Sequence, residues 1–129
     1  MNIKDLEKSI GWKIGYELSL AIYQITKKFP KEELYCLTSQ MRRSALSIPL
    51  NITEGLFRST KKELSRFFII ARGSAGELHT QLLLAHDLGY ITEVEANNLT
   101  SKTVEIIKIL TSSIKTLRGY NNRHNPQGL

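Results

Sequence analysis

The side chains in this chain that are best suited to bind a ligand are its cations, which are concentrated in one segment. Residues 42–72 contain seven Lys or Arg side chains and two Glu side chains, so they carry most of the formal net charge of +6. A surface with this excess of positive charge attracts anionic partners, which include nucleic acid, acidic proteins and anionic membrane surfaces. Charge alone leaves these three classes open.

One group of cations is close enough in sequence to act as a single site. It consists of Arg58, Lys61, Lys62 and Arg66. Side chains of this kind bind phosphate groups, so we predict that the cluster forms a nucleic-acid-binding patch for RNA or DNA. The alternative interpretation is a solvated corner of the fold that provides solubility.

Polar side chains at gaps of three and four residues form a stripe along residues 37–58. With Glu77, which we expect on a neighbouring helix, they predict a structural polar network of Gln40, Arg43, Asn51, Glu54 and Glu77. In this network Arg43 pairs with the carboxylates, within one subunit or between subunits. The alternative role for Arg42 and Arg43 is contact with nucleic acid. The aromatic side chains that could stack on bases are Tyr16, Tyr23, Tyr35 and Phe57, but aromatics at helical spacing more often belong to a core or an interface.

The sequence contains no spacing that is typical of a catalytic or metal site. A di-iron helical bundle needs Glu-x-x-His pairs, but Gly76 and Leu83 stand three residues before His79 and His86. No metalloprotease or phosphate-loop motif occurs, and Cys36 is the only cysteine. We therefore predict that the protein is not an enzyme and needs neither a metal nor a cofactor.

The same composition predicts a cytoplasmic protein. A single cysteine cannot form an internal disulfide, and the first residues lack the apolar core of a secretion signal. No apolar run approaches the ~20 residues that cross a bilayer, so we expect no membrane partner.

Apolar side chains recur at gaps of three and four through most of the chain, which predicts helices rather than strands. The first helix begins with Asp5 as its N-cap and ends before Pro30. The second covers residues 37–58 and contains Pro49, which removes a backbone donor and is expected to bend it.

Two capping boxes predict where the remaining helices begin. Thr60 with Glu63 starts the third helix, and Thr92 with Glu95 starts the fourth. Gly89 is expected to end the third helix in a left-handed conformation. The fourth helix should end near Gly119, which gives one domain over residues 1–119 and a flexible polar tail over 120–129.

Four helices with short connections predict an all-α, up-down-up-down four-helix bundle. The first and third helices carry more apolar surface than one core-facing stripe needs, which predicts self-association. Ile69 and Ile70 lie beside the main stripe of the third helix, and Gly73 and Gly76 would allow another backbone to approach closely. We predict that the interface of a homo-oligomer includes Ile69, Ile70 and Gly73.

Several segments carry a resemblance to a known family. They are Trp12, IYQITKKFPKEELYCL from Ile22, SQMRRSALSIPLNITEG from Ser39, RFFIIARGSAGEL from Arg66 and LAHDLGYI from Leu84. The chain resembles the bacterial four-helix-bundle proteins first met in intervening sequences of 23S ribosomal RNA genes. That family includes the accessory variability determinant of diversity-generating retroelements.

The resemblance implies a ring-like homopentamer with a basic surface and no enzymatic activity. For the retroelement members it further implies binding to nucleic acid and to a reverse transcriptase. Residues and resemblance together predict a non-enzymatic scaffold or adaptor whose basic surface binds RNA or DNA, with or without a protein partner. The alternative is an adaptor that docks an acidic protein such as a reverse transcriptase and has no nucleic-acid site of its own.

Overall fold

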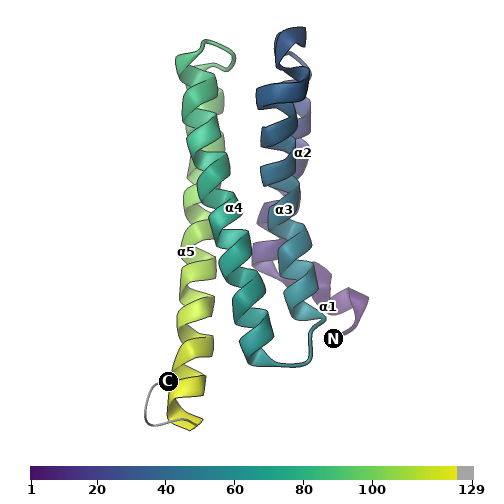
Figure 1. Ribbon diagram of the computed structural model, residues 1–129, viewed down its shortest axis with the longest axis vertical. Helices are drawn as coiled ribbons and strands as arrows, with labels where there is room; N and C mark the ends of the chain where they lie inside the picture. The colour runs from purple at the N-terminus through teal and green to yellow at the C-terminus, as the bar shows by residue number, and fades with distance from the viewer. Residues whose placement is uncertain (125–129) are drawn as a thin grey trace.

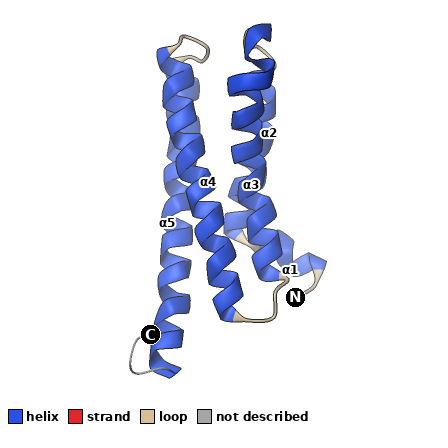
Figure 2. Ribbon diagram, viewed as in Figure 1, coloured by secondary structure: helices blue, strands red, loops and turns tan. Residues whose placement is uncertain are grey.

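The computed structural model describes the backbone of residues 1–124 and the side chains of residues 1–119. Across these residues the chain is helical between its turns and contains no strand, as Figure 2 shows. The α-helices are α1 (Ile3–Lys8), α2 (Ile10–Thr26), α3 (Ser39–Leu56), α4 (Lys61–Asp87) and α5 (Glu93–His124). A 3₁₀ turn, η1 (Lys31–Glu33), and a π-helical turn, η2 (Leu34–Thr38), connect α2 to α3.

The four long helices, α2 to α5, run alternately up and down and form one bundle (Figure 1). Each contacts the next along the chain, and α2 also contacts α5, which closes the bundle. The short α1 packs on α2 at the end of the bundle where α3 connects to α4 (Figure 1). The predicted all-α bundle is confirmed.

The first helix differs from the prediction because two capping residues divide it. Asn2 caps α1 by accepting hydrogen bonds from the backbone N–H groups of Lys4 and Asp5, at 2.9 and 3.1 Å. Ser9 then caps α2, accepting from the N–H of Trp12 at 3.2 Å. Asp5 is therefore not an N-cap: its carboxylate accepts from the N–H of Asn2 and completes the capping box of α1.

Pro49 lies inside α3, and the helix continues through it as regular α-helix. The ring of Pro49 is buried against α2 at Gly15, where an added Cβ would lie 3.2 Å from Pro49 Cδ and 2.9 Å from Ile48 Cγ2. The irregular backbone lies instead in η2, at Cys36, whose φ and ψ of −121° and −105° are outside the helical region. Pro49 therefore does not interrupt α3, and the predicted bend at this residue stays a prediction.

Both capping boxes predicted for the later helices place those helices correctly. The Thr60 hydroxyl accepts from the N–H of Glu63 at 3.1 Å, and the Thr92 hydroxyl accepts from the N–H of Glu95 at 3.1 Å. Gly89 has a φ of +79° directly after α4, as predicted. The fourth predicted helix is longer than expected, because α5 continues past Gly119 to His124. The last part of the predicted tail, residues 125–129, lies outside the described residues.

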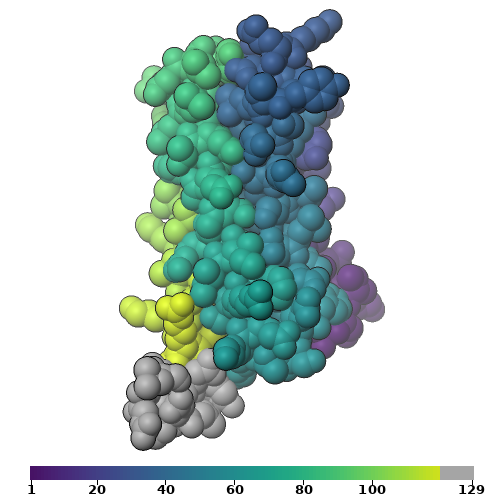
Figure 3. All heavy atoms as spheres, viewed as in Figure 1, coloured from purple at the N-terminus to yellow at the C-terminus, as the bar shows by residue number. Residues whose placement is uncertain are grey.

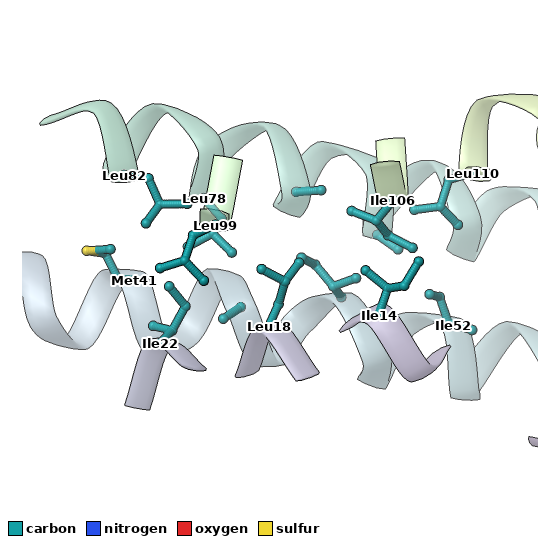
Figure 4. Close-up of a cluster of buried hydrophobic side chains, with 14 of the residues drawn as sticks. Ile14, Leu18, Ile22, Met41, Ile52, Leu78, Leu82, Leu99, Ile106 and Leu110 are labelled. Carbon is teal, nitrogen blue, oxygen red and sulfur yellow. The ribbon is translucent and has the colours of Figure 1, made fainter. Parts of the chain in front are cut away.

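The core is a continuous column of aliphatic side chains between the four long helices (Figure 4). Members with no exposed surface include Leu18, Ile22, Met41, Ile48, Ile52, Leu78, Leu82 and Ile106. Burying a side chain of this size stabilises a fold by roughly 1.5–3 kcal/mol, so this column supplies the main driving force of folding. Helix periodicity predicted most of these residues.

Gly73 and Gly76 are not points of close helix approach within one chain, and their role between subunits stays a prediction. A Cβ added at either position would meet no atom within 4 Å, so neither glycine lets another helix of this chain approach. Close approach occurs at Gly15, described above, and at Gly55, where an added Cβ would lie 3.0 Å from the Cβ of Phe67.

Among the described residues, no helix has both the length and the apolar character needed to span a membrane.

Candidate nucleic-acid interface

Arg58 is a member of the predicted cationic cluster that lies close to two carboxylates. Its Nη2 lies 2.6 Å from Glu54 Oε1, and its Nη1 lies 3.7 Å from Glu63 Oε2. The guanidinium also lies over the ring of Phe67, 5.1 Å from the centroid. With two carboxylates close by, Arg58 offers little net charge to a ligand.

The remaining cations of the cluster begin α4. Lys61, Lys62 and Arg66 are exposed on its first two turns. Lys62 and Arg66 line a shallow pocket of about 340 Å³ together with Arg118, which lies on the neighbouring helix α5. The structure thus brings together two predicted cations and one that sequence reasoning did not select.

A second shallow pocket continues the first along the seam between α4 and α5. It has a volume of about 350 Å³ and is lined by Arg72, Lys115 and the same Arg118. Arg72 Nη1 donates to Thr111 Oγ1 at 3.4 Å, which holds this guanidinium across the seam. We call the two pockets together the basic groove, defined by Lys62, Arg66, Arg72, Lys115 and Arg118.

The basic groove is positive because acidic side chains are absent from its walls. Within the described residues, none of its five cations forms an ion pair, and no Asp or Glu lines either pocket. A sequence signal for this existed: residues 106–129 contain no Asp or Glu. Antiparallel pairing places this acid-free part of α5 beside the first turns of α4 (Figure 1).

The predicted oligomer interface lies in the same place as the predicted nucleic-acid site. Ile69 and Ile70 line the first pocket beside Lys62 and Arg66. Ile70 is 42% exposed, whereas Ile69 is partly covered and packs against the core. Gly73 follows on the exposed surface of α4. The apolar surface suited to self-association therefore borders the basic groove.

The predicted polar network does not form inside one chain as expected. Glu54 is paired with Arg58, and within the described residues Arg43 is paired with neither Glu54 nor Glu77. Gln40, Arg43 and Glu77 are exposed. The version of the network that joins subunits stays a prediction.

A smaller polar seam takes the place of that network between α3 and α4. Asn51 Nδ2 donates to the backbone oxygen of Ser47 at 2.8 Å and to its Oγ at 2.9 Å. Ser47 Oγ in turn lies 2.8 Å from Ser74 Oγ. Only Asn51 of the predicted network takes part in this contact.

His79 and His86 each contact a polar side chain of the same chain, and His86 Nδ1 lies 3.5 Å from Asp87 Oδ1. His79 Nδ1 lies 2.7 Å from Thr103 Oγ1, a contact between α4 and α5. No group of three or more His, Cys, Asp or Glu side chains that could hold a metal ion occurs in the part of the chain that the structure describes. Cys36 is exposed on η2.

Comparison with known proteins places the chain in a family whose function is open. The model of the 23S rRNA-intervening sequence protein family matches residues 7–112. The fold is similar to the crystal structure, at 1.70 Å resolution, of a protein with unknown function from the S23 ribosomal protein family of Bacteroides thetaiotaomicron. The TM-score is 0.77 at 25% identity, and the match covers 82% of this chain and 99% of that chain. No protein of curated function matches the chain significantly.

Proposed function

The chain belongs to the family of 23S rRNA-intervening sequence proteins, and we propose that it is a non-enzymatic oligomeric scaffold whose basic groove binds nucleic acid. The proposal covers RNA and DNA alike, because cations that contact phosphates do not distinguish the sugars. The site is the α4–α5 seam, which replaces the α3–α4 corner predicted from sequence.

The observation that carries this proposal is the convergence of five cations on one seam, with no Asp or Glu among the described residues that line it. Lys62 and Arg66 come from the first turns of α4, and Lys115 and Arg118 come from α5 on the other side of the seam. Unpaired cations on a surface repel one another unless an anion lies between them. A phosphate backbone supplies anions at regular intervals, so it complements a row of cations along two helices.

Self-association would strengthen the binding of nucleic acid. The exposed apolar surface beside the groove supports self-association. Ile70 is exposed at the edge of the groove beside Arg66, so a second copy that contacts Ile70 and leaves the groove open would bring its own cations next to these. Several grooves in one assembly bind a long polyanion more tightly than one groove, because the later contacts become intramolecular. A ring, and a pentamer in particular, is part of this proposal.

The direct experiment compares two variants with the same loss of charge. One variant changes Lys62, Arg66, Lys115 and Arg118 to Gln, and the matched control changes Lys4, Lys8, Lys13 and Lys27 to Gln. All four control lysines are exposed and lie outside the groove. Fluorescence anisotropy with a labelled RNA hairpin and its DNA counterpart measures the affinity at low salt.

We expect the groove variant to lose more than tenfold in affinity and the control to lose little, because long-range attraction depends on net charge but contact depends on position. Equal losses in the two variants would mean that only overall charge matters, and the groove would not be the site.

The alternative function is a protein-binding adaptor that docks an acidic partner such as a reverse transcriptase. The apolar lining of the groove favours it, because Ile69, Ile70 and Ile114 lie beside the cations and an amphipathic acidic helix would contact both. Competition separates the two functions. A protein partner that occupies the groove as its natural ligand should remain bound in excess nucleic acid, whereas a nucleic-acid site should release it.

A further inference from the structure

A different pocket lies near the end of the bundle opposite the basic groove. It is formed by η2, the first turns of α3 and the last turns of α2, and its volume is about 510 Å³. Two leucines line it together with Tyr23, Tyr35, Ser39, Gln40, Arg42 and Arg43. We call it the tyrosine–arginine pocket. In Figure 3 its segments belong to the blue upper part of the visible face, while α4 begins in teal at the lower end.

Arg42 is held in place by two contacts from α2. Its Nε donates to Thr26 Oγ1 at 2.9 Å, and its guanidinium lies 4.9 Å from the centroid of the Tyr23 ring. The Thr26 hydroxyl donates in turn to the backbone oxygen of Ile22 at 2.6 Å, so its position is fixed by the helix. Within the described residues the Nη groups of Arg42 have no acceptor, and these donors stay available to a ligand.

The pocket carries positive charge that nothing on its walls neutralises. Arg43 follows Arg42 and is exposed. Among the described residues no Asp or Glu lines the pocket, and neither arginine forms an ion pair. Two guanidinium groups on successive residues, with an amide from Gln40 beside them, give a donor set suited to a phosphate.

The same pocket presents an aromatic surface. Tyr35 is 89% exposed, which is unusual for a ring of this size, and it extends from the π-helical turn η2. The backbone of η2 is kinked directly after Tyr35, at Cys36, so this turn does not continue the regular helix of α3. An exposed ring beside unpaired guanidinium groups is an arrangement that stacks on a nucleobase while its phosphate is bound.

We propose that the tyrosine–arginine pocket binds a nucleoside 5′-phosphate unit, with the phosphate on Arg42 and Arg43 and the base on Tyr35. The unit is either a free nucleotide or an unpaired nucleotide of a single strand, since both present the same groups. This site is separate from the basic groove, where no tyrosine lines either pocket. It therefore stands whether or not the groove binds nucleic acid.

The test uses the full chain and titration calorimetry with adenosine 5′-monophosphate and ribose 5-phosphate, which lacks the base. We expect the nucleotide to bind more tightly. Tyr35→Ala should lower the nucleotide affinity by roughly tenfold and leave ribose 5-phosphate unchanged, because only the base stacks. Arg43→Gln should weaken both ligands by roughly tenfold, because it removes a charged donor. Both positions are exposed, so neither change disturbs the core.

Matched controls are available elsewhere on the surface. Phe57→Ala removes a ring that is 49% exposed, and Arg66→Gln removes a cation of the basic groove. Neither should change nucleotide binding. Equal affinities for the two ligands, no binding of either, or loss of nucleotide binding in Arg66→Gln but not in Tyr35→Ala would each overturn the proposal.

A final arm distinguishes the two sources of the ligand. A single-stranded 5′-phosphorylated trinucleotide that binds more tightly than the mononucleotide, and still depends on Tyr35, identifies a strand as the source. Affinity no higher than that of the mononucleotide identifies a free nucleotide. Failure of the basic groove experiment leaves both results unaffected, because the groove variants retain this pocket.

Discussion

Ser19 compensates for the donor that Pro49 lacks. In a regular helix the backbone oxygen of Ala45 would accept from the N–H of residue 49, and proline has none. The Ser19 hydroxyl of α2 lies 3.1 Å from that oxygen and 3.0 Å from the backbone oxygen of Gly15. Ser19 and Ala45 are both buried, so water does not replace the missing bond easily. This contact explains how α3 accommodates its proline.

We predict that Ser19→Ala lowers the free energy of unfolding by about 1–3 kcal/mol, because a buried acceptor is left without a donor. The control is Ser101→Ala, an exposed serine of α5, which should change stability by less than about 0.5 kcal/mol. Chemical denaturation at one fixed protein concentration measures both. Similar values for the two variants would show that Ser19 does not support Pro49.

Glu95 gives the protein a stability contribution that depends on pH. Its pKa lies below the ordinary value of 4.5, chiefly because the carboxylate accepts from the backbone N–H of Thr92 and also because Lys28 Nζ lies 3.1 Å away. A pKa that is lowered by folding stabilises the folded state above the unfolded pKa. That stabilisation is lost as the pH falls through the folded pKa.

We therefore expect Glu95→Gln to be less stable than the natural chain near neutral pH, and the difference to shrink as the pH falls below about 4.5. Thermal unfolding across that range measures it, with Glu105→Gln, an exposed residue of α5, as the control. A difference that stays constant with pH would contradict the assigned cause.

At the scale of the element, the sequence predicted the features that depend on residues nearby in sequence, such as helix caps. It missed the features that depend on contacts with another helix. The Thr60 and Thr92 caps are local, because each threonine bonds a backbone group three residues away, and both were found. The continuity of α3 through Pro49 depends on Gly15 and Ser19 of another helix, and the sequence did not predict these two contacts. No pattern inside residues 37–58 contains that information.

Two glycines test how the helices pack, because the same change to alanine should have opposite effects on stability at the two positions. At Gly15 a Cβ would lie 2.9 Å from Ile48 Cγ2 and 3.2 Å from the backbone nitrogen of Pro49, so Gly15→Ala should destabilise the fold by about 1–3 kcal/mol. At Gly76 a Cβ meets nothing, so Gly76→Ala should stabilise α4 by up to about 1 kcal/mol. Urea unfolding of both variants checks the signs. The same sign for both would refute the close approach of α2 and α3.

The whole molecule carries its two cationic pockets near opposite ends of the bundle. The basic groove lies at the end where α4 begins, and the tyrosine–arginine pocket lies where α3 begins. Sequence reasoning found Lys62 and Arg66 because they cluster in sequence. It missed Lys115 and Arg118, which lie some fifty residues further along and reach the groove only through the antiparallel pairing of α4 and α5.

For the whole molecule, we predict self-association through a surface that includes Ile70. Ile70→Asp should lower the solution mass of the assembly and leave the helical circular-dichroism signal unchanged, because Ile70 is 42% exposed and outside the core. Val104→Asp changes a residue of similar exposure, 40%, on α5 and serves as the control. Light scattering measures the mass. An unchanged mass in Ile70→Asp would place the interface elsewhere.

The central claim is that the basic groove binds a phosphate backbone. The salt dependence of RNA affinity tests this claim most directly. The logarithm of the binding constant should fall linearly with the logarithm of salt concentration, with a slope that counts the phosphates contacted. We expect each groove cation replaced by Gln, for example Lys62 or Arg118, to reduce the steepness by roughly 0.7–0.9. The Lys4→Gln control should leave it unchanged. A slope that is the same in the groove variants and the natural chain would contradict the proposed site.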